Sequence, residues 1–252
     1  MNDLLSRWAR RLLPLLFWLL VWQAASVIIG REVFLPSPAQ VAVRVFQLAG
    51  TTALWQSIGY TTLRILAGYA LGVLSGALLA ALSVRFRAVE FLLSPLMLTV
   101  KTVPVASFII LALICFSAQR LSLLISFLMV LPILYQNTRS GILTADRQLD
   151  EMAWVFRLPP WRKLWHVTFP QVLPSLSAGC SVAIGLAWKS GVAAEVIGIP
   201  RGSVGSYLQQ AKVYLETTDL LAWTVVIVLA SLLCEKAVRA LLRALGRRSE
   251  RM

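Results

Sequence analysis

The sequence predicts an all-α, polytopic membrane protein with six transmembrane helices. Of its 252 residues, 58% are hydrophobic and only 14% are charged, whereas a soluble domain usually carries about 25% charged residues. A bilayer span needs roughly 20 mostly apolar residues, so the chain accommodates about six spans joined by short connections. The net charge of +13 does not indicate nucleic-acid binding, because the basic residues lie mostly at the ends of apolar segments, where membrane proteins place them.

The first predicted span is the apolar run at residues 12–30, which follows a basic start. This run is longer than the hydrophobic core of a signal peptide, which has about 7–15 residues, so we expect an uncleaved helix. A break with two prolines follows at 36–38, where Ser37 is a candidate N-cap. The amphipathic pattern at 38–50 predicts a short helix at the outer membrane surface.

The second predicted span, residues 58–83, carries a stripe of small residues. They recur every four positions and therefore share one face of a helix; they are Gly68, Gly72, Gly76 and Ala80. Such a stripe lets two helix backbones approach closely. We therefore expect the three glycines to serve helix packing, with chance recurrence in a glycine-rich helix as the alternative.

The remaining predicted spans are residues 91–116, 121–141, 172–198 and 220–238. Pro95 and Pro104 interrupt the third span. Only residues 117–120 separate it from the fourth, so we expect these two spans to be antiparallel neighbours.

The distribution of Lys and Arg predicts the orientation. With a cytoplasmic N-terminus, 16 of the 24 Lys and Arg residues fall in cytoplasmic segments and 5 in outer segments. The positive-inside rule then places both termini in the cytoplasm of a multi-pass protein of the cell inner membrane. The predicted units are an N-terminal helix with an outer-surface segment (1–56), a core membrane domain (57–245) that includes the cytoplasmic loop 142–170, and a basic tail (246–252).

The polar loop at residues 142–170 is the longest polar interruption of the chain. Asp146 or Asp150 is a candidate helix start, because acidic residues are favourable in the first turn. Three side chains further along share an apolar face; they are Met152, Val155 and Phe156. Pro159 and Pro160 are expected to end this helix, and a second short helix at 161–167 is expected to end before Pro170. The pattern predicts an exposed docking element, and a merely solvated loop is the alternative.

This loop resembles the cytoplasmic EAA loop of ABC importer permeases. The family pattern is Glu-Ala-Ala, three residues, Gly, nine residues, then Ile-x-Leu-Pro. The chain has Glu151-Met152-Ala153, then Arg157, then Val167-Thr168-Phe169-Pro170, with every spacing kept. Arg157 stands where the family has glycine, which permits a left-handed turn. We therefore expect a differently closed turn, formed by Leu158-Pro159-Pro160.

The resemblance extends over almost the whole chain and is closest to the nitrate/sulfonate/taurine branch of these permeases. The matching stretches include Leu35-Pro36-Ser37-Pro38, Gly68-Tyr69-Ala70-Leu71-Gly72, Ala187-Trp188 and Val192-Ala193-Ala194-Glu195-Val196-Ile197-Gly198. The resemblance implies the MetI-like ABC importer permease fold and a non-catalytic subunit that passes a small solute, such as an organic or inorganic anion. It implies as partners two ABC ATPase subunits, a second permease subunit (most simply a second copy) and an extracytoplasmic substrate-binding protein. The residues expected to couple to the ATPase are Asp150, Glu151, Met152, Ala153, Phe156 and Arg157.

The charges within the predicted spans are the candidates for the translocation pathway, because ionisable groups at membrane depth are costly and commonly functional. They are Lys101, one turn before Pro104, together with Lys189 and Glu195. Two alternatives remain open: Lys101 snorkels to an interface, or Lys189 and Glu195 pair with other helices and only hold the bundle together. An excess of cations would suit an anionic substrate.

The sequence also bears on competing classes of membrane protein. It contains one histidine, His166, and no nucleophile–base pattern within the spans, so it predicts neither catalytic residues nor a metal or cofactor site. There is no Gly-x-x-x-x-Gly-Lys-Ser/Thr loop, so ATP hydrolysis is assigned to a separate chain. The main alternative is a secondary carrier or channel, and an integral membrane enzyme is a less favoured one.

Overall fold

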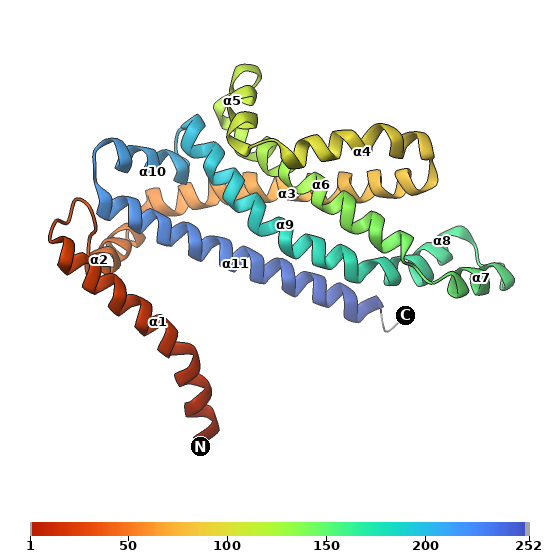
Figure 1. Cartoon of the computed structure of the whole chain (residues 1–252), viewed down its shortest axis with the longest axis horizontal. Helices are drawn as coiled ribbons and strands as arrows, with labels where there is room; N and C mark the ends of the chain where they lie inside the picture. Colours follow the sequence, from red (N-terminus) through yellow and green to blue (C-terminus); the bar gives the residue numbers. More distant parts are fainter. Residues whose placement is uncertain (1, 250–252) are drawn as a thin grey trace.

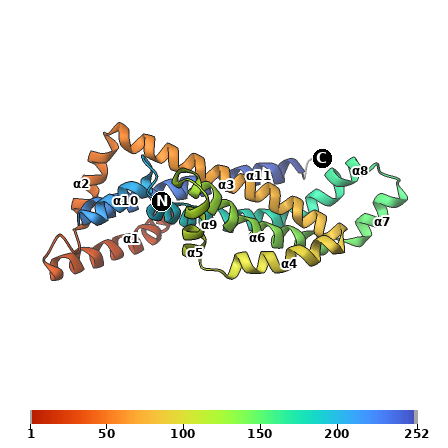
Figure 2. The same ribbon diagram turned by 90° about the horizontal axis from the view of Figure 1, so that it is seen from above.

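The computed structural model of the protein describes residues 2–249, and every regular element in that range is helical. The elements are α1 (Asn2–Ile29), α2 (Pro38–Ala49), α3 (Thr52–Arg85), α4 (Arg87–Thr102), α5 (Val105–Cys115), a 3-10 turn (Ala118–Arg120), α6 (Leu121–Leu143), α7 (Arg147–Val155), α8 (Pro160–Lys163), a π-helical turn (Leu164–Thr168), α9 (Phe169–Gly198), α10 (Val204–Val213) and α11 (Thr217–Ser249). The long helices run roughly along one axis (Figure 1). The α7–α8 loop lies at one end of the molecule and α2 at the other (Figure 2).

Helices α3, α6 and α9 form the centre of the bundle. Their fully buried side chains include Ile65 of α3, Val130 and Leu134 of α6, and Ile184 of α9. The small-residue stripe of α3 faces α6: a Cβ atom built on Gly68, Gly72 or Gly76 would lie between 2.3 and 2.8 Å from an atom of α6. No side chain fits in that space, so α3 and α6 are in backbone-to-backbone contact along the stripe.

Helix α2 begins at the predicted cap but packs differently from the expectation. Ser37 and Gln40 form a reciprocal capping box, in which each side chain accepts a hydrogen bond from the other residue's backbone amide. Its apolar residues Val41 and Leu48 are buried in a cluster that includes Trp223 of α11. The face expected to lie on the membrane surface is therefore occupied by protein.

An ion pair at the same end of the molecule reinforces this packing. Arg44 of α2 donates hydrogen bonds of 2.5 and 2.8 Å to the two carboxylate oxygens of Asp219, in the first turn of α11. A bidentate Arg–carboxylate pair is geometrically specific, so it fixes the orientation of α2 on α11.

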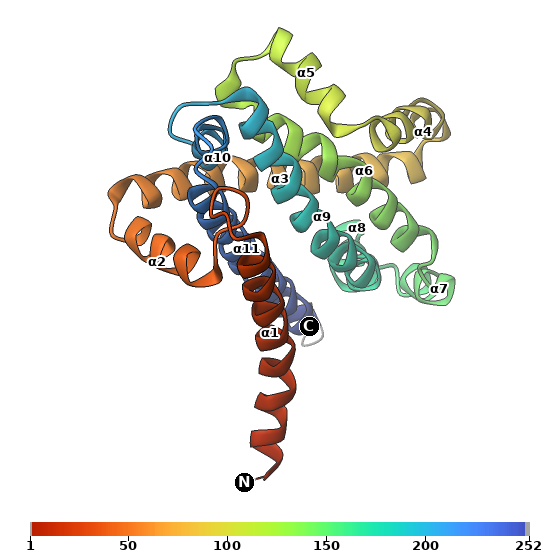
Figure 3. The ribbon, with the colours of Figure 1, turned by 60° about the vertical axis from the view of Figure 1, so that its left-hand side comes forward.

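The third predicted span is interrupted at Pro104, as expected. It consists of α4 and α5, whose axes are bent by 105° at Val103–Pro104 (Figure 3). Proline provides no backbone N–H and disfavours the helical conformation of the residue before it, so the helix ends there. Pro95, by contrast, lies within α4. As expected, α4 lies beside α6, where Met97 is buried with Leu131 and Tyr135.

Three helical segments in the described range are long and apolar enough to cross a membrane: Thr52–Arg85, Ala118–Leu143 and Pro160–Gly198. The bent pair α4–α5 raises the number to four if it is one span. The N-terminal helix contributes a shorter apolar stretch, Leu16–Ile29, and diverges from the rest of the bundle (Figure 1). The last helix continues beyond the predicted end at 238 to Ser249, so the predicted basic tail begins inside α11, and residues 250–252 lie outside the described range.

Candidate functional site

The polar loop between α6 and α9 is anchored at its start by Asp146. The Asp146 carboxylate accepts a 2.8 Å hydrogen bond from the Gln148 amide and caps α7. The Asp146 amide itself donates a 2.6 Å hydrogen bond to Oε1 of Gln171, near the start of α9. Of the two predicted helix starts, Asp146 is therefore the one used, and it ties the loop to α9.

Helix α7 exposes large apolar side chains outside the bundle. Ala153 faces inward and is 2% exposed, whereas Met152, Trp154, Val155 and Phe156 are 41%, 81%, 68% and 72% exposed. We call these four residues the α7 knob. Contiguous apolar exposure of this kind marks an interaction surface. Our sequence interpretation included Met152, Val155 and Phe156 but missed Trp154, although a tryptophan in an otherwise polar loop was a usable signal.

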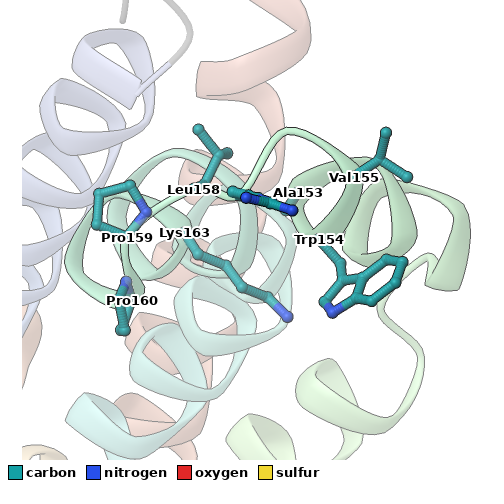
Figure 4. Close-up of a pocket in the computed structure, with 8 residues that line it drawn as sticks. Ala153, Trp154, Val155, Leu158, Pro159, Pro160 and Lys163 are labelled. Atoms are coloured by element: carbon teal, nitrogen blue, oxygen red, sulfur yellow. The ribbon is translucent and has the colours of Figure 1, made fainter.

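The acidic residues of α7 differ in their surroundings. Asp150 forms an ion pair of 3.1 Å with Lys163 of α8, so it links the two short helices of the loop. Glu151 is exposed next to the knob. Between α7 and α8 lies an open groove of about 640 Å³, lined by residues that include Trp154, Arg157 and Lys163 (Figure 4).

The turn after α7 contains a left-handed residue at position 157, as the family's glycine would provide. The expected closure by Leu158-Pro159-Pro160 is therefore wrong. Arg157 has φ of 49°. Its amide donates to the Trp154 carbonyl (2.9 Å), and the Leu158 amide donates to the Ala153 carbonyl (3.0 Å). This is the Schellman arrangement, in which a left-handed residue ends the helix. Helix α7 therefore ends before Pro159, and Pro160 instead begins α8.

We expect Arg157→Gly to stabilise the loop, because a side chain in the left-handed region costs about 1–2 kcal/mol and glycine avoids much of this. The measurement is hydrogen–deuterium exchange of the Leu158 amide, which should slow by about fivefold, the factor that corresponds to 1 kcal/mol. Gln148→Gly, within α7, is the control and should accelerate exchange. Faster exchange in Arg157→Gly would contradict the assigned turn.

The predicted second short helix does not end before Pro170. The segment Pro160–Gly198 is continuous and contains the π-helical turn Leu164–Thr168, where the Phe169 amide donates to the Leu164 carbonyl. A π turn changes the hydrogen-bond register by one residue, and Pro170 falls in the first turn of α9, where its missing N–H is tolerated. The second half of the loop therefore runs into α9 without a break in the helix.

Both candidate pathway lysines lie on the outside of this single chain. Lys101, in the last turn of α4, is exposed, and its Nζ donates a 3.2 Å hydrogen bond to Oε1 of Gln136 on α6. Pro104 follows at the break between α4 and α5. Lys189 is exposed on α9, one turn after Gly185, which has open space beside it. Our sequence interpretation missed Gln136.

Glu195 differs from the other candidates because its side chain is completely buried. Its Oε2 accepts hydrogen bonds from Thr61 Oγ1 of α3 (2.8 Å) and from the Gly205 amide of α10 (3.3 Å). A Cβ atom on Gly205 would lie 2.3 Å from the Cβ of Glu195, so α10 sits directly on this part of α9. In the single chain Glu195 joins three helices and does not reach the surface.

These features define a class: a helical protein with three or four segments long and apolar enough to cross a membrane, and with a loop at one end that exposes large apolar side chains. Residues 68–251 match the sequence profile of the family described as "Binding-protein-dependent transport system inner membrane component". The chain belongs to this family.

Relatives of known name agree with this assignment. The chain is 27% identical to the taurine transport system permease protein of Escherichia coli over 89% of this chain and 83% of that protein. It is 30% identical to a putative aliphatic sulfonates transport permease protein of Escherichia coli over 84% of this chain and 82% of the relative. It is 26% identical to the nitrate import permease protein of Synechococcus elongatus over 77% and 73%. The predicted resemblance to this branch is confirmed.

Solved structures support the fold. A chain of an amino acid ABC transporter superposes with a TM-score of 0.59 at 16% identity, covering 78% of this chain and 94% of that one. A chain of the methionine ABC transporter superposes with a TM-score of 0.56 at 18% identity, covering 76% and 93%. The protein is therefore the non-catalytic, inner-membrane permease component of a binding-protein-dependent ABC importer, a system that also contains an ATPase and a binding protein.

Proposed function

We propose that this chain forms half of an ATP-driven translocation pathway and that the loop at 142–170 receives the ATPase. The observation that carries the proposal is the α7 knob, in which Trp154 and Phe156 are 81% and 72% exposed on a helix outside the bundle. In this proposal Glu151, Met152 and Phe156 contact the ATPase. Asp150, Ala153 and Arg157 maintain the shape of the loop: Asp150 pairs with Lys163, and Ala153 and Arg157 take part in the turn.

The ATPase can act on the bundle through this loop because both ends of the loop are rigidly attached. The Asp146 amide is hydrogen-bonded to the Gln171 side chain, and α8 runs through the π turn into α9. A force on α7 is therefore transmitted to α6 and α9, the two helices that pack at the centre with α3. A loop without these attachments would not transmit the force to α6 and α9.

The solute that we propose is a small organic or inorganic anion. Several relatives are named for taurine, aliphatic sulfonates, nitrate or bicarbonate, and these solutes carry a negatively charged group. Two others are named for riboflavin and formylaminopyrimidine. Lys101 and Lys189 supply cations on the exposed side of α4 and α9. We place them, with Pro104, along the pathway. For Glu195 the complete burial supports the alternative role of holding α3, α9 and α10 together.

The assembly that we propose contains two copies of this chain, two ATPase subunits and one binding protein. The exposed lysines support it, because a charge at membrane depth needs cover from protein or water rather than lipid. A second copy facing α4, α6 and α9 would supply that cover. The six spans would be α1, α3, the broken pair α4–α5, α6, α9 and α11, with both termini in the cytoplasm.

Reporter fusions test this topology. Fusions after Arg87, Gln148 and Arg248 should report the cytoplasm, and fusions near Pro36 or Ser203 should report the outside. The reason is the 16-to-5 distribution of basic residues between the two sides. A fusion at Gln148 that reports the outside would overturn both the orientation and the assignment of the loop to the ATPase.

A further inference from the structure

The left-handed residue that ends α7 is an arginine, although the turn makes no use of its side chain. The turn is closed by the backbone amides of Arg157 and Leu158, which donate to carbonyls at 2.9 and 3.0 Å. Glycine would form the same turn at a lower conformational cost than arginine with a φ of 49°. A residue held in an unfavourable backbone conformation is a reason to look for a function of its side chain.

The Arg157 side chain is exposed and lines the open groove of about 640 Å³ between α7 and α8. The walls of this groove are mostly apolar and include Trp154 and Pro159, and Lys163 supplies a second cation (Figure 4). Lys163 is already paired with Asp150. Within the described residues, none of the ion pairs includes Arg157. The guanidinium of Arg157 is therefore available to a binding partner.

The groove and the α7 knob form one continuous surface. Trp154 and Val155 belong to the knob and also line the groove. A protein that covers the knob therefore covers the groove as well, and it removes water from Arg157. A guanidinium that loses water without gaining an acceptor is costly, so the partner has to supply one. A carboxylate suits this position best, because its two oxygens match the fork of the guanidinium group.

The distribution of charge along the loop also favours an acidic partner beside the groove. The acidic residues of the loop all precede the knob; they are Asp146, Asp150 and Glu151. Residues 157–170 contain Arg157, Arg162 and Lys163 and no acidic residue. The segment that follows the knob is thus basic, and complementary charge steers a partner to one orientation on such a surface.

We infer that Arg157 and the α7–α8 groove form the part of the docking surface that receives an acidic side chain of the ATPase. The backbone of Arg157 ends α7, and its guanidinium binds the carboxylate of the partner in the groove. This inference rests on the proposed function and deepens it, since it gives the chemistry of the ATPase residue that faces position 157. It also makes Arg157 a determinant of which ATPase this chain accepts.

Two substitutions separate the charge of Arg157 from its place in the turn. Arg157→Gln removes the charge and leaves a long side chain in the same backbone conformation, whereas Arg157→Gly removes the side chain and relieves the backbone. The measurement is association of the full-length permease with the ATPase of the same system, by copurification over a series of ATPase concentrations. Both variants should weaken the association by roughly tenfold, near the lower end of the couplings measured for close charge pairs at interfaces.

The opposite signs of two readouts in Arg157→Gly make the test specific. The Leu158 amide should become more protected from exchange while the association with the ATPase becomes weaker, a combination that a purely structural role of Arg157 would not produce. Arg157→Lys retains a cation and should retain part of the association, and Arg157→Glu should weaken it more than Arg157→Gln does. Raised salt should weaken the wild-type association more than that of Arg157→Gln.

The matched control is Arg162→Gln, which removes the same charge from an exposed residue of α8 that does not line the groove. It should leave the association unchanged. Wild-type association in Arg157→Gln, or an equal loss in Arg162→Gln, would overturn the inference. The proposed function is tested separately by replacing Glu151, Met152 and Phe156 together. If this triple variant loses the ATPase and Arg157→Gln does not, the docking loop stands and the acidic contact falls; if the triple variant binds normally, the docking loop itself falls.

Discussion

Replacing Glu151 and two residues of the α7 knob, in what we call the α7 knob variant, is expected to uncouple this permease from its ATPase. The variant carries Glu151→Lys, Met152→Ala and Phe156→Ala. Phe156 is 72% and Met152 41% exposed, so their truncation removes little from the bundle itself. Buried aromatic anchors at interfaces typically contribute 2 kcal/mol or more each, and a reversed charge adds like-charge repulsion. We expect the association to weaken by at least about a hundredfold, the factor that corresponds to 2.8 kcal/mol.

The measurement is copurification of the ATPase and transport-dependent ATP hydrolysis in membranes with matched expression. Phe46→Ala is the control, because Phe46 is 79% exposed on α2, at the opposite end of the molecule. It should leave both quantities unchanged. The knob variant should still insert in the membrane, since its substitutions lie outside the apolar spans. Normal association and hydrolysis in this variant would exclude the docking role of α7.

Neutralising the two exposed lysines is expected to have the second large effect. Lys101→Met with Lys189→Met should reduce uptake by about ten- to a hundredfold, because a hydrogen bond to a charged group contributes about 1.5–3 kcal/mol. Both side chains are exposed in the single chain, so the loss of uptake should come without loss of folding or of ATPase binding. Unchanged uptake kinetics in the double variant would exclude the anion pathway and leave the lysines as snorkelling residues.

Glu195→Gln serves as the matched comparison for the lysine variants. Its amide oxygen can accept the hydrogen bonds from Thr61 and the Gly205 amide that Oε2 of Glu195 accepts. If Glu195 only joins α3, α9 and α10, this substitution should retain uptake, whereas Glu195→Ala should reduce the amount of folded protein. A loss of uptake in Glu195→Gln at normal expression would return Glu195 to the pathway.

The helices, including those of the loop at 142–170, could largely be predicted from the sequence because their signals are local. The apolar runs predict α3, α6 and α9, and the Ser37 and Asp146 caps are read directly from short motifs. The spacing of the small residues indicates a single face of α3. The spacing does not identify the helix that packs against this face. Only the structure shows that this helix is α6.

The features that could not be predicted depend on tertiary contacts or on a conformation that a residue type rarely adopts. Proline at 104 indicates a break, but the 105° bend depends on what α4 and α5 pack against. Arginine rarely takes a left-handed conformation, so its residue type gave no reason to expect the turn at 157. The burial of Glu195 depends on Thr61, which is 134 positions away, and no local pattern relates the two.

The most direct test of the account is uptake into proteoliposomes that contain this chain with its ATPase and the binding protein of the same system. The relative permeases suggest taurine, an alkanesulfonate and nitrate as the solutes to supply. The account predicts uptake that requires internal ATP and the binding protein, persists when the proton gradient is collapsed, and is lost in the α7 knob variant. Uptake that continues without ATP and disappears with the proton gradient would contradict it and identify a secondary carrier instead.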